Sequence, residues 1–197
     1  MSQLALTLAE PVTLTADTLG PDHPHTLGSL DNLAFAYHNA GRLDEAIPLF
    51  EQTLDARIRI LGPHHPDTLT SRNSLAVAYQ TADRLDEAIT LQEQNLTDRT
   101  RTLGPNHTDT LTTQAYLAIA YRTAGRLDEA ITLLEQNLED CIRILGPDHP
   151  RTLTSRNDLA SAYRAAGRFE DADKLFETPS DSEQDDTEED PDQETDD

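Results

Sequence analysis

A repeat of 42 residues constrains this chain more than any other feature of its sequence. The dipeptide Leu-Gly occurs at 19/20, 61/62, 103/104 and 145/146, always at that spacing. Residues 62–103 and 104–145 are identical at 28 of 42 positions, far more than shared composition produces. Such a period indicates an array in which each unit packs on its neighbours. We place the units at 20–61, 62–103, 104–145 and 146–177, after a half unit at 1–19.

Each unit is predicted to contain two helices. In the second unit, Leu69, Leu75 and Tyr79 share one helical stripe that begins with a proline, which predicts a first helix, A. The following stretch, 84–104, has acidic residues in its first turn and arginines near its end, as the helix dipole favours, and it predicts a second helix, B. We expect A helices near 24–40, 66–82, 109–124 and 151–166, alternating with B helices.

The helix pairs are expected to stack, because two amphipathic helices alone cannot cover both of their apolar stripes. Small residues recur where the helices would approach one another most closely. They are Ala34, Ala76, Ala118 and Ala160 on A helices, and Ala46, Ala88, Ala130 and Ala172 on B helices. The predicted fold is therefore all-α, a superhelix of stacked antiparallel helix pairs with no strand. Glycines would end the A helices, and Asp83, which tolerates a left-handed conformation, takes that place in the second unit.

The order Leu69, Arg72, Leu75, Ala76, Tyr79 and Ala88 resembles the tetratricopeptide signature. The 42-residue spacing with LGPxHPxT between units is similar to that of its kinesin-light-chain-type branch. The resemblance covers residues 20–177 and the half unit before them. It implies a non-catalytic scaffold that holds an extended or helical peptide on the concave face of its A helices. Similar arrays in bacteria often sit behind a signalling ATPase.

The same resemblance, carried over position by position, implies which A-helix residues line the binding groove. The predicted peptide-binding residues are Asp31, Phe35, His38, Asn73, Val77, Gln80, Ile119, Arg122, Asn157 and Arg164, with Ala115 and Ser161 in the same rows. Positions four and seven apart on a helix share one face, which agrees with this placement. The rows vary from unit to unit, as selective recognition requires, although drift on an idle surface would give the same variation. Tyr116, which replaces a small or polar residue beside these rows, is added as an aromatic anchor.

The net charge of −22 is concentrated at the C-terminus, where residues 178–197 hold 11 acidic and no basic side chains. This segment has too little apolar surface to order itself, so we expect a disordered acidic tail. An acidic chain without a Lys/Arg cluster is a poor nucleic-acid binder. The tail is expected either to act as a solubiliser or to fold back over arginines of the A helices. Those arginines are Arg72, Arg122, Arg156 and Arg164.

Recurring polar residues are interpreted as structural rather than as catalytic or metal-binding groups. His23, His65, His107 and His149 are about one helix pair apart, roughly 20 Å, which is too far to share a metal ion, so we expect them to cap helices. Asp86 and Glu87 recur in every unit at a helix N-terminus, where negative charge is favourable anyway. No GxxxxGK[ST], GxSxG or HExxH motif is present. We therefore predict no enzyme activity, no catalytic residue, no metal and no cofactor.

The expected location is the cytoplasm. Cys141 is the single cysteine, so no intramolecular disulfide can form. The N-terminus has no basic stretch and is interrupted by Glu10 and Pro11, so we expect neither a signal peptide nor a membrane span.

Two further functions remain open beside peptide binding. The first is self-association, or a sensor role, through the open ends of the solenoid, because an uncapped end exposes apolar surface. The second is that the chain is a piece of a larger signalling ATPase, since the array begins in the middle of a repeat.

Overall fold

A computed structural model describes residues 14–177 of the protein. Its A helices are α2 (Pro24–Asn39), α4 (Pro66–Thr81), α6 (Thr108–Thr123) and α8 (Pro150–Ala165). Its B helices are α3 (Leu43–Leu61), α5 (Leu85–Leu103), α7 (Leu127–Leu145) and α9 (Phe169–Lys174). A short helical stretch at 14–19 precedes them, and the described part of the chain contains no strand. The predicted all-α array is confirmed, with A helices within about one residue of the expected bounds.

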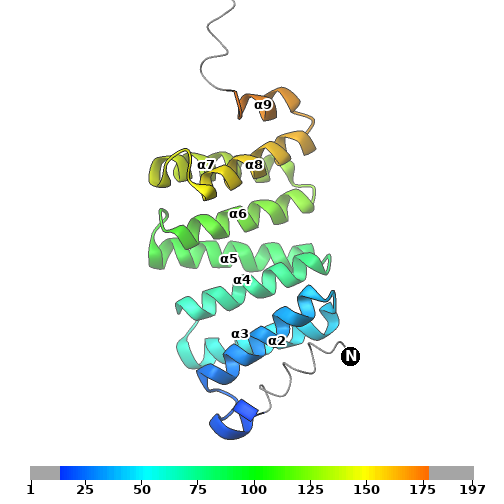
Figure 1. Cartoon of the computed structure of the whole chain (residues 1–197), viewed down its shortest axis with the longest axis vertical. Helices are drawn as coiled ribbons and strands as arrows, with labels where there is room; N and C mark the ends of the chain where they lie inside the picture. The colour runs from blue at the N-terminus through cyan, green and yellow to red at the C-terminus, as the bar shows by residue number, and fades with distance from the viewer. Residues whose placement is uncertain (1–13, 178–197) are drawn as a thin grey trace, which may run out of the picture.

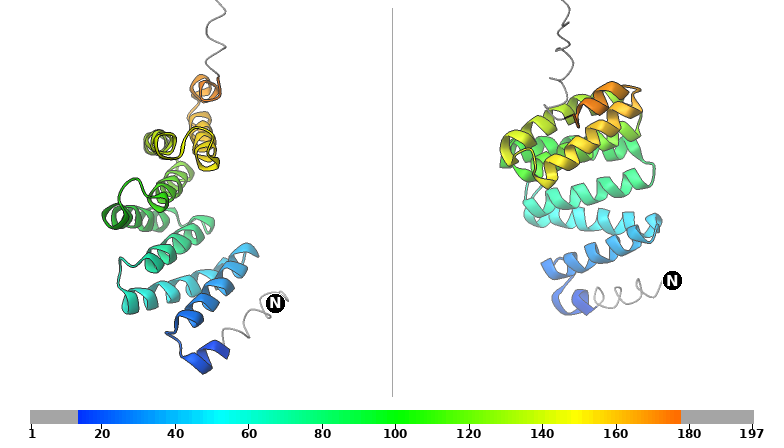
Figure 2. Two further views of the ribbon diagram at one scale, coloured as in Figure 1. Left: turned by 60° about the vertical axis from the view of Figure 1, so that its left-hand side comes forward. Right: turned by 45° about the horizontal axis from the view of Figure 1, so that its top comes forward.

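The helices form a column in which each helix packs on the next one along the chain (Figure 1). The A helices form one row and the B helices another, as the left view of Figure 2 shows. Helix α6 contacts both α4 and α8, whereas no two successive B helices in residues 14–177 pack as extensively. The A helices therefore lie on the inner side of the curved stack, and the B helices spread apart on the outer side.

The turn between units is held by a histidine and a threonine. In each A helix the Nδ1 atom of the preceding histidine accepts a hydrogen bond from the backbone N–H two residues later, at 3.1 to 3.2 Å. The threonine at the third position after each of these histidines donates to the glycine carbonyl that ends the previous helix, as Thr68 does to Gly62 at 2.9 Å. This satisfies groups that a helix terminus otherwise leaves unpaired. The predicted capping role of His23, His65, His107 and His149 is confirmed.

The turn within each unit requires a left-handed residue. Gly41, Gly125 and Gly167 have φ values of 72°, 77° and 76°, and Asp83 has a φ of 60° at the equivalent place. The next backbone N–H then reaches back to the helix, as in Arg84 to the Tyr79 carbonyl at 2.9 Å. This pattern matches a Schellman-type helix end, and the conformation predicted for Asp83 is confirmed.

The eight alanines predicted at the closest helix contacts are all buried, none more than 1% exposed. Around them, a tyrosine of each later A helix joins two units. The Tyr121 hydroxyl donates to Glu93 of the preceding B helix at 2.8 Å, while Arg126 lies 4.3 Å over its ring and pairs with Glu129. Tyr79 and Tyr163 make the same bond to Glu51 and Glu135. A carboxylate thus accepts the hydroxyl hydrogen bond of each of these three core tyrosines.

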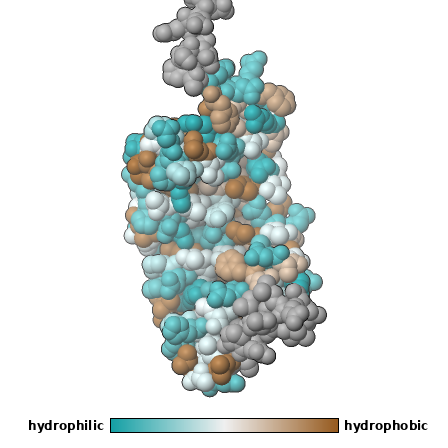
Figure 3. Space-filling view, in the orientation of Figure 1, coloured by the Kyte–Doolittle hydropathy of each residue, from teal (hydrophilic) through white to brown (hydrophobic). Residues whose placement is uncertain are grey.

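The predicted half unit at 1–19 lies mostly outside the described residues, and the predicted tail at 178–197 lies wholly outside them. On the face shown in Figure 3, apolar side chains are scattered among hydrophilic ones and do not form one continuous patch.

Candidate functional site

The A-helix face is the candidate site, and polar side chains join its neighbouring helices. His38 Nε2 of α2 lies 3.0 Å from the Thr81 hydroxyl of α4. Gln80 of α4 donates to the Thr123 hydroxyl of α6 at 3.3 Å. Both bonds join residues 43 positions apart, so two members of one predicted row link successive A helices. His38 and Gln80 therefore have a structural role in addition to the recognition role predicted for them.

In the first two units, the predicted residues are already engaged within the protein. Asp31 forms an ion pair with Arg57 of α3 at 2.6 Å, and desolvation raises the pKa of the Asp31 carboxyl despite this partner. Asn73 accepts a hydrogen bond from Gln92 of α5 at 2.9 Å. Phe35 is 44% exposed and packs edge-on against Phe50. Of these three, Phe35 offers the most open surface to a partner.

The A-helix face is hollowed between α6 and α8. A pocket of about 320 Å³ lies there, and Ala115, Tyr116 and Ile119 of α6 form its apolar wall. Ala115 and Ile119 were predicted from the same resemblance, and Tyr116 separately as an aromatic replacement. The structure brings them together at one cavity, which we call the A-face pocket.

Polar groups surround the A-face pocket on its other sides. Asn137 of α7 donates to the Leu111 carbonyl at 2.8 Å and accepts from the Ser155 hydroxyl at 2.8 Å, so its amide is fixed. Arg151 of α8 donates to the Thr108 carbonyl at 2.6 Å. Asp158 is half-buried, and desolvation raises the pKa of its carboxyl although Arg122 lies nearby. The pocket therefore combines an apolar wall with amide, guanidinium and carboxyl groups whose positions are set by the fold.

The remaining predicted residues lie outside this cavity. Val77 is half-buried on α4, and Asn157 is exposed on α8. Arg122 lies at the α6–α8 junction near Asp158. Arg164 is directed to the C-terminal end of the stack, where it pairs with Asp173 of α9 at 3.3 Å. The predicted binding residues are therefore spread along the whole stack, and the pocket among them lies between α6 and α8.

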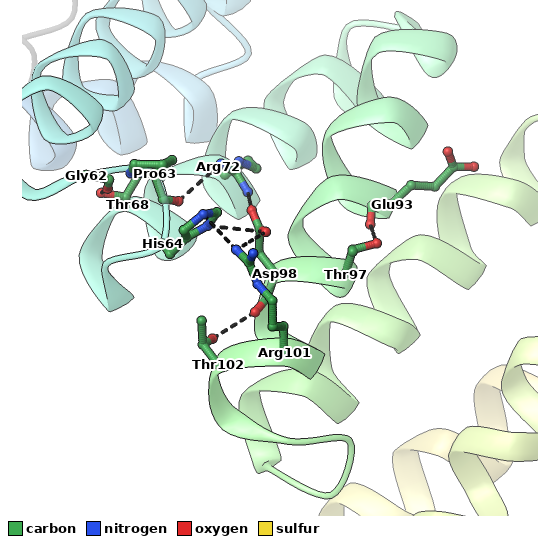
Figure 4. Close-up of polar contacts among 10 residues, drawn as sticks. All are labelled: Gly62, Pro63, His64, Thr68, Arg72, Glu93, Thr97, Asp98, Arg101 and Thr102. Carbon is green, nitrogen blue, oxygen red and sulfur yellow. Dashed lines mark hydrogen bonds and ion pairs between the residues drawn. The ribbon is translucent and has the colours of Figure 1, made fainter.

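One arginine considered for the tail contact is not available on the surface. Arg72 is buried and bonds to Asp98 of α5 at 2.7 Å, and Asp98 also binds His64 at 3.2 Å and Arg101 at 3.2 Å (Figure 4). The guanidinium also donates to the Pro63 carbonyl. The prediction that the tail covers Arg72 was wrong, because Arg72 is buried. Its equivalents in the first and third units, Leu30 and Gln114, are buried as well. Only Arg122, Arg156 and Arg164 remain as surface cations of that set.

Residues 14–177 contain neither a cluster suited to a metal ion nor a membrane-spanning helix. In that range, no group of three or more His, Cys, Asp or Glu side chains is arranged to hold a metal ion. No helix there is both long and apolar enough to span a membrane.

Several pocket residues were not predicted from the sequence. Arg151, Ser155 and Asp158 come from the helix of the next unit, and they enter the site only because α8 lies against α6. Asn137 had a detectable signal, since an asparagine stands on the otherwise apolar stripe of a B helix, with Asn95 one repeat earlier.

Comparisons with known proteins agree with this architecture. The family model described as tetratricopeptide repeat matches residues 25–96, 73–139 and 112–178. A crystal structure from Podosopora anserina, described as a kinesin light chain with nearly identical TPR-like repeats, is 37% identical with a TM-score of 0.77, and 87% of this chain aligns with 81% of that one. A variant of that protein with one substituted residue is 36% identical with a TM-score of 0.78, over the same shares of the two chains. BtubC (BKLC) from P. vanneervenii shares the fold at 20% identity and a TM-score of 0.68, over 77% of this chain and 61% of its own. A search of curated proteins finds no match.

Proposed function

The chain belongs to the tetratricopeptide repeat family, and from that membership we propose that it is an interaction scaffold that holds a peptide or protein segment on its A-helix face. This fold is typically a non-catalytic interaction module. We assign no reaction to the protein, and we place it in the cytoplasm, a location compatible with its single buried cysteine.

The A-face pocket is the observation that carries this proposal. Its volume of about 320 Å³ is at the lower end of the range for ligand sites, about 300–1,000 Å³. A cavity of this size takes one large side chain of a peptide rather than a whole cofactor. Tyr116 and Ile119 would contact that side chain, since aromatic residues in partly desolvated pockets contribute most to binding in protein interfaces.

The polar groups around the pocket support binding of a peptide backbone beside the anchoring side chain. Thr154 and Asp158 line the cavity beside the apolar wall, whereas the Thr112 hydroxyl there already donates to the Thr108 carbonyl and accepts from Arg151. Hydroxyl and carboxylate groups pair with the N–H groups of an extended peptide, which would otherwise lose their hydrogen bonds to water. We therefore expect a ligand that has one apolar anchor and that makes main-chain hydrogen bonds on either side of it.

A selection from a library of short random peptides against the whole chain tests this proposal. Tyr116→Ala is expected to weaken a selected peptide by roughly tenfold or more, the effect of losing about 2 kcal/mol at a hot spot. Ile142→Ala is the control, because Ile142 is an exposed apolar residue of the B helix α7 that lines neither the pocket nor any other cavity used in the argument. Equal losses in the two variants, or no loss in either, would contradict the proposed site.

Self-association through the C-terminal end is a second candidate function. Leu153 is 42% exposed, whereas its equivalents Leu27, Leu69 and Leu111 are at most 4% exposed. Leu27 packs on Ala56 in the C-terminal half of its own B helix, α3, whereas α9 ends at Lys174. Phe169 and Phe176 are also exposed at this end. A second copy stacked there would cover the same surface. Analytical ultracentrifugation of the chain and of Leu153→Ser decides between a concentration-dependent dimer, lost in the variant, and a monomer at all concentrations.

A further inference from the structure

The outer side of the stack carries a second set of cavities, separate from the A-face pocket. The larger has a volume of about 520 Å³ and lies between α5 and α7, with α6 at its base. We call it the B-face groove and define it by Glu93, Leu96, Leu117, Asp128, Glu129 and Leu133. It is open because successive B helices spread apart on the outer side, whereas the A helices close the inner side.

The B-face groove has an apolar base and an acidic rim. Leu117 is buried, and Leu96 and Leu133 are half-buried, so all three leucines leave only part of their surface to solvent. Three carboxylates, from Glu93, Asp128 and Glu129, stand around them, and no lysine or arginine is among the lining residues. A binding surface of this composition suits an apolar side chain with a positive charge next to it.

Internal contacts leave much of this negative charge uncompensated. Glu129 pairs with Arg126, which also lies over the ring of Tyr121. Glu93 accepts a hydrogen bond from the Tyr121 hydroxyl, which is uncharged at neutral pH because burial and this carboxylate raise the pKa of Tyr121 to about 12. The hydrogen bond therefore fixes the Glu93 carboxylate without neutralising it. The Asp128 side chain has no hydrogen bond or ion pair with another described residue, so it is the rim charge most free to meet a cation, whereas Arg126 partly compensates Glu93 as well as Glu129.

The same cavity recurs one repeat earlier. Leu75, Tyr79, Asp86, Glu87, Thr90 and Leu91 line a pocket of about 340 Å³, and each stands 42 positions before a residue of the B-face groove. Two carboxylates and two leucines again line the pocket, and no basic residue is among the lining residues. Acidic rim and apolar base are thus retained at neighbouring places on the outer side, where the same acids also stand in the first turn of a B helix and favour its dipole.

We propose that the B-face groove is a second docking surface, for a cationic amphipathic segment of a partner protein in which leucine-like side chains are flanked by lysine or arginine. The apolar side chain would lie on Leu96, Leu117 and Leu133, with its basic neighbours against Glu93 and Asp128. Charge complementarity argues for this occupant over an acidic or purely apolar one, because desolvating three carboxylates without a cation is unfavourable.

The test uses a fluorescein-labelled peptide, Lys-Leu-Lys-Leu-Lys-Leu-Lys, and fluorescence anisotropy with the whole chain at about 0.05 M salt, where exposed charges are weakly screened. Asp128→Lys is expected to weaken binding about fivefold, a fold-change typical of exposed charge pairs. Asp67→Lys is the matched control, since Asp67 is also an exposed acid in the first turn of a helix but lies on an A helix away from both cavities. Circular dichroism of both variants shows whether they remain folded.

Two control peptides and one further variant complete the design. A peptide with serine in place of leucine should bind at least fivefold more weakly, because it leaves the three leucines of the groove uncovered, and one with glutamate in place of lysine should not bind. Tyr116→Ala should not change the affinity for the lysine–leucine peptide, so failure here is distinguishable from failure of the A-face proposal. The inference is overturned if Asp67→Lys and Asp128→Lys weaken binding equally, since net charge alone would then explain it. It is also overturned if the serine peptide binds as well as the leucine peptide.

Discussion

Asn95 and Asn137 occupy the same position in successive B helices, and they provide a sharp test of the interior of the fold. Both are buried, with 0% and 2% of their surface exposed. The Asn137 amide bonds to the Leu111 carbonyl, to Gln114 at 3.0 Å and to Ser155. Both polar atoms of the Asn95 amide, in contrast, find no hydrogen-bond partner among the described residues.

The sequence differences between the two units explain this contrast. Arg72 stands where the third unit has Gln114, and its guanidinium turns to Asp98 instead of the asparagine. Thr113 stands where the fourth unit has Ser155, and its hydroxyl donates to the Asp109 carbonyl at 3.0 Å. The two side chains that would satisfy Asn95 are therefore used elsewhere.

Leucine has the same number of side-chain heavy atoms as asparagine and the same branch point, so it replaces either residue without a large change of shape. An unpaired buried amide costs about 1–3 kcal/mol, so we expect Asn95→Leu to raise the free energy of unfolding by about 1 kcal/mol after some loss to imperfect packing. Asn137→Leu leaves the side chains of Gln114 and Ser155 without their amide partner and removes a second hydrogen bond to the Leu111 carbonyl. We expect it to lower the free energy of unfolding by about 2–4 kcal/mol.

Urea unfolding followed by far-ultraviolet circular dichroism measures both changes, and thermal midpoints should shift by about 2–4 °C per kcal/mol for a chain of this size. Because repeat arrays do not always unfold in one step, the slopes of the two variants must match that of the parent chain before free energies are compared. If Asn95→Leu destabilises the protein as much as Asn137→Leu does, Asn95 has a partner and the reasoning is refuted.

Three further predictions follow from particular residues. Burial and hydrogen bonds to carboxylates raise the pKa of Tyr79, Tyr121 and Tyr163 to about 12. Because the pKa of an unfolded tyrosine is about 10, the stability that these residues contribute is complete below pH 10 and is lost as the pH rises toward 12. Tyrosinate absorbance near pH 10 from all five tyrosines of the folded chain would contradict this. Asp83→Gly should raise the free energy of unfolding by about 0.5–1 kcal/mol because Asp83 has a φ of 60°, and a lower urea midpoint would show that the aspartate is preferred there. Removing residues 178–197 should leave the affinity for a selected peptide unchanged at low and high salt, because Arg72 is buried against Asp98 and exposed charge pairs with the other arginines contribute little. Tighter binding at low salt alone would show that the tail covers Arg122, Arg156 or Arg164.

The helix pattern was predictable because each local signal in the sequence acts within one unit. Prolines and histidines begin the A helices, and Gly41 or Asp83 ends them, so bounds could be given to within about one residue. The alanine contacts followed from the same periodicity. These features depend on neighbours along the chain and not on how units are placed relative to each other.

The site was predictable only in part, because it depends on contacts between units. Tyr116 and Ile119, predicted as binding residues, line the A-face pocket, but nothing in the sequence indicated that Asp158 and Arg151 of the next unit would close the same pocket. The direction of Arg72 was also missed, since an arginine in an apolar position can turn either to solvent or to a buried carboxylate such as Asp98. The outer B-face groove was not anticipated, because its leucines looked like ordinary core residues and its acids like helix-terminal charges.

The most direct test of A-face binding is nuclear magnetic resonance of the methyl groups of the whole chain during titration with a selected peptide. Ile119 lines the A-face pocket, whereas Leu133 lines the B-face groove, so the two methyl signals report on opposite sides of the stack. We predict that the peptide shifts the Ile119 methyl signals in proportion to the bound fraction and leaves those of Leu133 unchanged. Shifts confined to Leu133 and other B-helix methyl groups would contradict the claim that the A-helix face is where this protein binds its partner.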